Sequence, residues 1–307
     1  MAVKFRTYTG GINKCEDYKK LHDFLVESKN TEYTYARFDW MMTNREYLEA
    51  QYLDRIGIWE DGNQIVATTL YDHSLDDIFP IAKAGYEFLY SEMLAYAKSY
   101  MKKGDNPDFR VYICDTNQTL KKAALESRMM PTECKEMVAF YDLSGDFTGR
   151  NLPKVNLPEG YSIISLEDSH DFEKYAQCLF KGFDHEANGE TFNFTEELRS
   201  LYHNGYEREY VELNLKILII DSYGNYVAHC GMWYDKNSDI ALVEPVCTIP
   251  NERGRGLGKQ VVLEGLHRVK EMGAKKAVVG SNERFYFSIG FIPQSTGTFW
   301  IEQPIKY

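Results

Sequence analysis

The sequence has 307 residues, enough for two ordinary domains, and 44% of them are hydrophobic and 14% aromatic, which is ample for packed cores. Its 35 basic and 46 acidic residues give a formal net charge of −11. This charge argues against nucleic acid as the main partner and mildly favours a cationic one, although it also serves solubility.

In the first half, strand and helix signals alternate. The predicted elements are strand 4–9, helix 18–26, a hairpin over 55–71 that turns at 61–63, helix 86–101, strand 109–114, helix 120–129 and strand 136–142. Residues 144–160 are rich in Gly, Pro and Asn and have no apolar period, which is typical of a linker. We therefore expect a first domain at 1–143, a linker at 144–157 and a second domain at 158–307.

The second half repeats this order of elements. It is predicted to hold strand 161–165, helix 172–180, a long polar segment, a hairpin over 214–233 that turns at 223–225, strand 240–249, a loop, a helix that ends near Gly273, strand 275–281 and a short helix around Tyr286. A tandem duplication is the economical interpretation. The halves differ at one loop, because residues 77–86 of the first half contain a single glycine and no arginine.

The corresponding loop of the second half, Pro250–Lys259, lies between a predicted buried strand and an amphipathic helix. This order directs backbone N–H groups and the positive end of a helix dipole at one point, where a phosphate fits. Three glycines let the backbone approach a ligand, and three basic side chains add positive charge. These residues are Gly254, Gly256, Gly258, Arg253, Arg255 and Lys259.

The spacing in this loop distinguishes between phosphate-binding motifs. A dinucleotide fingerprint would need its third glycine at Lys259, and a Walker loop would need four residues between its glycines, where this loop has three. The pattern R-x-x-G-x-G does fit, with Arg253, Gly256 and Gly258. It resembles the acetyl-coenzyme A signature of the GNAT superfamily of N-acetyltransferases.

A second segment resembles the same family. Tyr286, Gly290 and Phe291 match its Y-x-x-x-G-F segment, in which the tyrosine faces the thioester sulfur. Many members also have an asparagine about two turns before the tyrosine, whereas Asn282 precedes Tyr286 by only four residues. The resemblance covers 158–307 by motifs and 1–142 by element order alone.

The resemblance implies an α/β (α+β) fold of tandem GNAT-like domains, each a mixed, mostly antiparallel sheet flanked by helices. The first domain would be a degenerate copy, as in other tandem members. In the second, acetyl-CoA would be the cofactor, and the strand before the loop would pair with its pantetheine arm and offer an N–H group to the developing oxyanion. The implied contact residues are Val246, Cys247, Thr248, Arg253, Gly254, Arg255, Gly256, Leu257, Gly258 and Lys259.

Acetyl transfer to an alkylamine requires two proton movements. The ammonium group must first lose a proton to a general base, for which Glu244 is the first candidate and His229 the second. Each has a structural alternative, an ion pair with a core arginine for Glu244 and a hydrogen-bonded strand histidine for His229. Tyr286 would protonate the departing thiolate. Cys247 could carry the acyl group covalently, but the resemblance implies direct transfer, and a small buried thiol is the ordinary interpretation.

We therefore expect an N-acetyltransferase that moves the acetyl group of acetyl-CoA to a primary amine in a ternary complex. The alternative is a non-catalytic acyl-CoA-binding sensor or scaffold. The segment 182–197 corresponds to the family's acceptor loop, and its acids and aromatics would suit a cationic amine or would equally form a solvated surface. The acceptor stays open among polyamines, aminoglycosides, amino acids and peptide or lysine amines.

Cysteine usage and the N-terminus bear on the compartment. The six cysteines include no Cys-x-x-Cys pair and no histidine at metal-ligand spacing, so reduced thiols explain them better than disulfides or zinc. Residues 1–8 lack the apolar core of a signal peptide, and no run of eighteen apolar residues is present. We expect a cytoplasmic protein with no metal site and no membrane or nucleic-acid partner.

Overall fold

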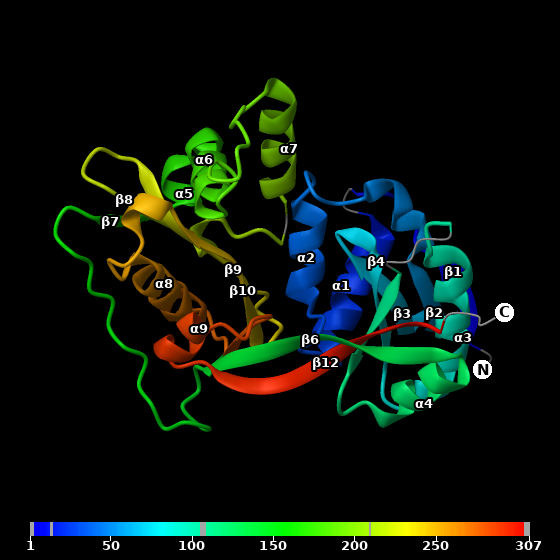
Figure 1. The fold of residues 1–307 in the computed structure, drawn as a ribbon. Coiled ribbons are helices and arrows are strands. Elements are labelled where there is room, and N and C mark those ends of the chain that lie inside the picture. The colour runs from blue at the N-terminus through cyan, green and yellow to red at the C-terminus, as the bar shows by residue number, and fades with distance from the viewer. Residues whose placement is uncertain (1–2, 13–14, 105–108, 209, 304–307) are drawn as a thin grey trace. The chain divides into compact units, whose positions relative to one another are not determined.

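The structure, a computed structural model, describes residues 3–12, 15–104, 109–208 and 210–303. Their contacts divide the chain into two compact units. The first unit comprises Met1–Val138 and Gln294–Tyr307, and the second unit comprises Ala139–Pro293. Each unit is a mixed, mostly antiparallel sheet with helices packed on it (Figure 1).

The sheet of the first unit has the strand order β1-β2-β3-β4-β5-β12-β6. The bounds are β1 (Lys4–Thr7), β2 (Gly57–Asp61), β3 (Gln64–Asp72), β4 (Ser74–Ala82), β5 (Arg110–Cys114), β12 (Ile292–Glu302) and the first part of β6 (Met129–Asp142). Its helices are α1 (Glu16–Ser28), α2 (Tyr35–Thr43), α3 (Tyr90–Tyr96), which continues into a π-helical turn at Ala97–Met101, and α4 (Gln118–Glu126), with short 3-10 turns at Ala50–Arg55 and Glu87–Leu89. Helix α1 packs on α2, and α3 packs on α4.

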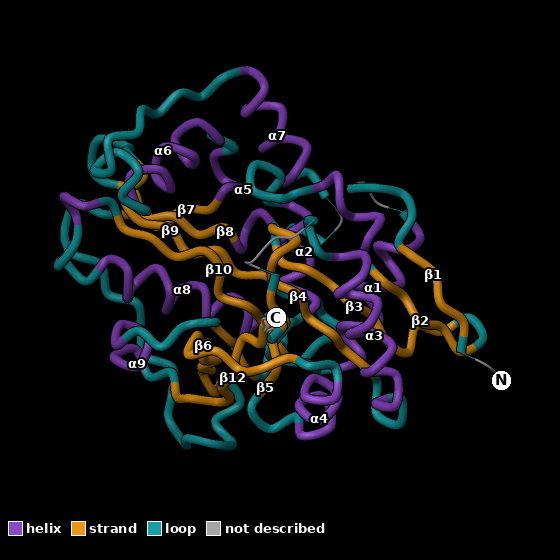
Figure 2. The backbone as a smooth tube through the Cα atoms, turned by 45° about the vertical axis from the view of Figure 1, so that its right-hand side comes forward, coloured by secondary structure: helices purple, strands orange, loops and turns teal. Residues whose placement is uncertain are grey.

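The sheet of the second unit has the strand order β6-β11-β10-β9-β8-β7, and the end of β6 forms one edge. The strands are β7 (Ser162–Ser165), β8 (Lys216–Ile220), β9 (Tyr226–Trp233), β10 (Ile240–Thr248) and β11 (Lys276–Val279). The helices are α5 (Leu166–Ser169), α6 (Phe172–Gly182), α7 (Glu196–Tyr206), α8 (Leu257–Glu271) and α9 (Arg284–Ile289), with 3-10 turns at Leu213–Leu215 and Pro250–Glu252. The predicted linker before β7 has no regular secondary structure (Figure 2).

Two apolar cores cover the two faces of the second unit's sheet. Alternate side chains of β8 divide between them, since Ile217 and Ile219 join the core of α8 whereas Leu218 joins the core of α6. Helices α6 and α8 accordingly lie on opposite sides of β8–β10 (Figure 1). The site described below lies at the end of β10, where both helices contact that strand.

The last strand of the chain belongs to the first unit. Residues 297–300 of β12 pair with Val111–Cys114 of β5, while residues 139–142 of β6 pair with 276–279 of β11 in the second unit. The sequence-based division at 143 and 158 placed both strands differently, because it followed chain order. Hydrogen bonding between strands distant in sequence decides their actual place.

Each unit contains one parallel strand pair that separates after a few residues. Strand β4 pairs with β5 only at Asp77↔Arg110 and Ile78↔Val111. Strand β10 pairs with β11 only from Ile240↔Lys276 to Leu242↔Val278. Beyond these points the strands of each pair hydrogen-bond only to their other neighbours. We call the resulting unpaired gap between the two strands the wedge, and each unit has one.

Candidate functional site

A glycine turn connects β10 to α8 in the second unit. Gly254 and Gly256 have φ values of 81° and 82°, a left-handed conformation that glycine adopts without a Cβ penalty. Gly256 is the N-cap of α8, and no side chain caps it. The N–H groups of the first helical turn therefore point at the space before the helix. A Cβ at either glycine would meet no atom within 4 Å, so the backbone of the turn is uncovered at these two positions.

The third glycine of the motif, Gly258, allows close packing between elements. A Cβ at Gly258 would lie 3.1 Å from Oγ1 of Thr248 and 3.3 Å from Cε2 of Phe285. The small residue thus lets the start of α8 lie close to the end of β10 and to α9. Helix start, strand end and the tyrosine helix come together at this point.

The arginines of the motif make contacts that the sequence did not predict. Arg253 donates from Nε to the carbonyl of Thr248 at 3.0 Å and from Nη2 to the carbonyl of Gly182 at 2.8 Å, and it forms an ion pair with Asp184 at 2.9 Å. Its guanidinium group therefore fastens the end of α6 to the end of β10. This connects the acceptor-loop segment to the glycine turn.

Arg255 is held on the other side of the turn. Its Nη1 donates to the hydroxyl of Tyr161 at 3.1 Å, and its Nε lies 3.3 Å from a carboxylate oxygen of Glu252. Tyr161 in turn donates to the same carboxylate at 2.5 Å. Arg255 is 56% exposed, so it contributes positive charge beside the turn while it stays in place.

Strand β10 carries a bulge beside the wedge. Between Val243 and Val246 the strand has one residue more than the facing segment of β9. The carbonyl of Glu244 accepts a hydrogen bond from Nε1 of Trp233 at 2.7 Å, and a Cβ at Gly231 would come within 2.3 Å of this carbonyl. The absence of a side chain at Gly231 therefore makes room for the bulge, which precedes the expected cofactor-contact residues.

Tyr286 lies on α9, and Glu244 lies on the bulged part of β10. The tyrosine ring packs against Phe285 and Phe291, with centroid distances of 5.0 and 5.5 Å. Burial raises the pKa of the Tyr286 phenol well above its usual value, and the nearby carboxyl group of Glu244 raises it further. Both side chains are half-buried. The phenol therefore keeps its proton at neutral pH, as a proton donor must.

His229 is placed in the core instead. It is fully buried; its Nδ1–H donates to the carbonyl of Ile217 at 2.9 Å, and its Nε2 accepts from the hydroxyl of Tyr175 at 3.2 Å. Burial lowers the pKa of His229 to about 3, so the ring is neutral and both nitrogens are used. The structural alternative for His229 is the one that this geometry supports.

Cys247 also faces a packed core. It joins the cluster of α6, and its Sγ lies 3.7 Å from the carbonyl oxygen of Cys178. A Cβ on Gly182 would come within 2.5 Å of the Cys247 sulfur, which shows how closely the helix covers it.

All six cysteines are free. In the described part of the chain, no group of three or more His, Cys, Asp or Glu side chains is arranged to hold a metal.

The acceptor-loop segment is partly ordered by its own side chains. Phe180 stacks on His185 with a centroid distance of 5.3 Å, and Nδ1 of His185 lies 2.8 Å from a carboxylate oxygen of Glu190. The segment then leads into α7, which Thr195 caps by accepting from the N–H of Leu198.

Over the residues described, no helix combines the length and apolarity that crossing a bilayer requires.

The chain resembles known proteins in one stretch of its sequence and in its fold. Residues 180–291 match the family model described as Acetyltransferase (GNAT) family. Among curated proteins, none matches the sequence significantly. Among solved structures, a GCN5-related N-acetyltransferase from Sphaerobacter thermophilus is similar, with 11% identity, a TM-score of 0.57 and 98% of both chains covered.

Two further structures are similar over almost the whole chain. A tandem GNAT protein from the clavulanic acid biosynthesis pathway has 12% identity and a TM-score of 0.57, over 97% of this chain and 98% of its own. A glucosamine N-acetyltransferase region of a fungal multi-domain β-N-acetylglucosaminidase has 14% identity and a TM-score of 0.53, over 98% of this chain and 38% of its own. At such identities the likeness concerns the fold. Residues 180–291 thus match the GNAT acetyltransferase family model, and the chain as a whole has a tandem GNAT-like fold.

Proposed function

We propose that the second unit is an N-acetyltransferase that uses acetyl-CoA and a primary amine. The observation that carries this proposal is the convergence of three features: an uncapped helix start behind two left-handed glycines, a bulged strand beside a wedge, and a half-buried tyrosine with a raised pKa. The family match over 180–291 supports acyl transfer as the class of reaction.

The glycine turn fits the pyrophosphate of coenzyme A. The positions of a Cβ on Gly254 and Gly256 are open, and no side chain caps α8, so the backbone N–H groups at the start of the helix would be available to a phosphate oxygen. Arg255 and Lys259 add positive charge, whereas Arg253 supports the turn through Thr248 and Gly182. When bound, the cofactor would supply an acetyl thioester. The open wedge beside β10 would hold its arm along Val246, Cys247 and Thr248.

Two proton transfers are assigned to this chain's own residues. Glu244 would accept a proton from the ammonium form of the acceptor, directly or through a water molecule, so that the amine lone pair can attack. A backbone N–H near the bulge would stabilise the oxyanion. The phenol of Tyr286, protonated at neutral pH, would then give its proton to the departing thiolate.

The acceptor is proposed only by class. The segment that Arg253 fastens to the turn carries several acids and aromatic rings, which favours a cationic amine. Glucosamine belongs in any panel because one structural relative is named a glucosamine N-acetyltransferase. The free thiols further lead us to place the protein in the reducing cytoplasm.

The test is a titration of the full chain with coenzyme A, followed by a thiol-release assay with acetyl-CoA and an amine panel. Saturable binding together with amine-dependent release of thiol supports the proposal. Binding without turnover on any amine would instead favour the acyl-CoA-binding sensor or scaffold. Absence of binding would contradict both.

A further inference from the structure

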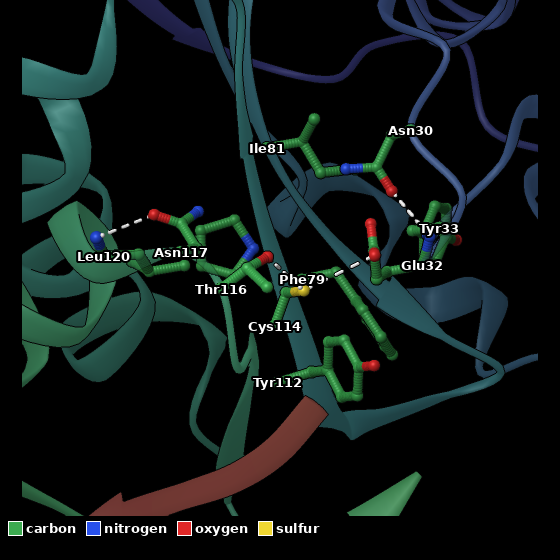
Figure 3. Close-up of a pocket in the computed structure, with 11 residues that line it drawn as sticks. Asn30, Glu32, Tyr33, Phe79, Ile81, Tyr112, Cys114, Thr116, Asn117 and Leu120 are labelled. Carbon is green, nitrogen blue, oxygen red and sulfur yellow. Dashed lines mark hydrogen bonds between the residues drawn. The ribbon is translucent and has the colours of Figure 1, made fainter. Parts of the chain in front are cut away.

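The first unit contains a cavity of its own at the wedge between β4 and β5. Its volume is about 190 Å³, and Phe79–Ile81 of β4 and Tyr112 and Cys114 of β5 line it beyond the last pair of the two strands. Asn30 and Glu32, between α1 and α2, lie on one side, and Thr116 and Asn117 lie on the other (Figure 3). No residue of the glycine turn takes part, since that turn belongs to the second unit.

Aromatic rings form a continuous wall of this cavity. Tyr33 lies 4.8 Å from Phe79 between ring centroids, and Phe79 lies 5.3 Å from Tyr112. All three rings are buried in the core and are held in place by it. Aromatic faces attract cations through their quadrupoles, and the attraction grows where water is excluded.

Glu32 brings a negative charge to the same cavity. Its Oε1 accepts from the hydroxyl of Ser295 at 2.9 Å and lies 3.5 Å from the sulfur of Cys114. These neutral contacts orient the carboxylate without neutralising it. Across the described part of the chain, the ion pairs include none to Glu32. Arg37 is not among the residues that line the cavity. Its guanidinium group donates to the Glu32 carbonyl at 3.5 Å, lies 5.8 and 5.0 Å from the ring centroids of Tyr33 and Phe79, and is paired with Asp72 at 2.5 Å.

Size and charge together restrict the ligand. Sites for drug-sized molecules typically exceed roughly 300 Å³, so this cavity suits a molecule of a few carbon atoms and not a nucleotide. An anionic ligand would meet the Glu32 carboxylate at close range. A small cation would gain a counter-ion and an aromatic wall.

We propose that the wedge of the first unit binds a small organic ammonium ion, with the Glu32 carboxylate as its counter-ion and the rings of Tyr33, Phe79 and Tyr112 as its wall. This site is separate from the transfer site, and the proposal does not depend on the activity of the second unit. The first unit would then be a ligand-binding unit that has kept its wedge without the glycine turn.

The experiment is isothermal titration of the full chain, without acetyl-CoA, with n-butylammonium chloride as the probe and butan-1-ol as its neutral match. We expect saturable binding of the cation, with a Kd in the millimolar range, and no saturable binding of the alcohol. Glu32→Gln keeps the shape and removes the charge, so it should weaken binding about tenfold or more. Glu16→Gln, a matched change at a side chain that is 81% exposed, should leave binding unchanged.

Two further variants locate the site and keep the proposal open to refutation. Thr116→Trp places a ring at the exposed mouth and should abolish binding even if Glu32→Gln does not fold. Tyr286→Phe changes the second unit and should bind the probe like the unmodified chain. Lack of saturable binding by the unmodified chain, or equal binding by Glu32→Gln in folded form, would overturn the proposal. Loss of binding in Tyr286→Phe would assign the probe to the second unit and would equally overturn it.

Discussion

Replacement of Tyr286 by phenylalanine removes one oxygen atom from the proposed site and leaves the ring in place. The ring's contacts with Phe285 and Phe291, at 5.0 and 5.5 Å, do not involve the hydroxyl. We therefore expect folding and the affinity for coenzyme A to change little. If the phenol protonates the thiolate, turnover should fall by roughly 10²–10⁴, the range of a lost general acid. This loss corresponds to about 3–5 kcal/mol of transition-state stabilisation.

The assay is release of free coenzyme A from acetyl-CoA with a saturating amine, alongside titration of coenzyme A binding. Tyr234→Phe is the matched control, because Tyr234 is a buried tyrosine of the same unit away from the turn. Its turnover should stay within a factor of a few of the unmodified chain.

The pH dependence gives a second check on Tyr286. Burial and Glu244 raise its pKa above the usual value of about 10, so the protonated, active form persists beyond pH 10. The high-pH limb of the rate profile should therefore lie above pH 10 and should vanish in Tyr286→Phe. Unchanged turnover in this variant would refute the general-acid role, and loss of coenzyme A binding alone would mark Tyr286 as a packing residue.

Three other predictions follow from the same geometry. Gly256→Val forces a side chain into the left-handed region of the backbone at a cost of about 1–2 kcal/mol and places it on the uncovered side of the turn. The affinity for coenzyme A should therefore fall at least tenfold, even in high salt. Arg255→Ala should cause a smaller loss of affinity, and this loss should fade as salt is added. Cys247→Ala should keep its transfer activity, and mass spectrometry after incubation with acetyl-CoA should find no acetyl adduct on the unmodified chain; an adduct that Cys247→Ala abolishes would contradict direct transfer. The pKa of His229 is about 3 in the folded chain, below the unfolded value of about 6.5. Its contribution to the free energy of unfolding is therefore complete above pH 6.5 and falls toward pH 3 by up to about 1.4 kcal/mol per pH unit. In urea unfolding, the stability of His229→Gln should fall less steeply over this range, and an unchanged dependence of stability on pH would contradict the assignment.

Local signals in the sequence predicted the elements that local chemistry determines. The two hairpins turn where glycine follows aspartate or tyrosine, and β2–β3 and β8–β9 form there. The motif that ends at Lys259 predicted a strand, a turn and a helix, and the structure contains all three. The short α9 was likewise expected, and it begins after Asn282.

Elements without a clear apolar period were missed. Strand β12 contains Pro293 and Gly297, and its pairing with β5 comes from a segment about 180 residues away, so no local window reveals it. Strand β4 contains Pro80 and two adjacent acids. Helix α7 lies in a polar segment, although the capping residue Thr195 was a signal that could have found it.

Within the candidate site, residue types were predictable but their contacts were not. The sequence assigned Arg253 to phosphate binding, whereas its guanidinium group contacts Gly182 and Asp184, which are about 70 residues away. His229 likewise makes a hydrogen bond to a residue distant in the sequence, Tyr175 of α6. Such contacts arise from packing of helices on a sheet, which no spacing rule encodes.

The placement of the terminal strands affects how the units can be studied. A fragment of residues 1–150 would lack β12, which pairs with β5 in the first unit, and a fragment of 158–307 would lack the end of β6, which pairs with β11. Both fragments would expose a strand edge. We therefore expect each to be less stable than the whole chain, and point variants of the full chain are the better probes.

The most direct test of the central claim is amine-dependent release of coenzyme A from acetyl-CoA by the full chain, measured together with the acetylated amine by mass spectrometry. The amine panel should include polyamines, glucosamine, amino acids and peptides. We predict that at least one amine is acetylated, that coenzyme A and product form in equal amounts, and that Gly256→Val removes both. Binding of coenzyme A without acetylation of any amine, or acetylation that Gly256→Val leaves intact, would contradict the account.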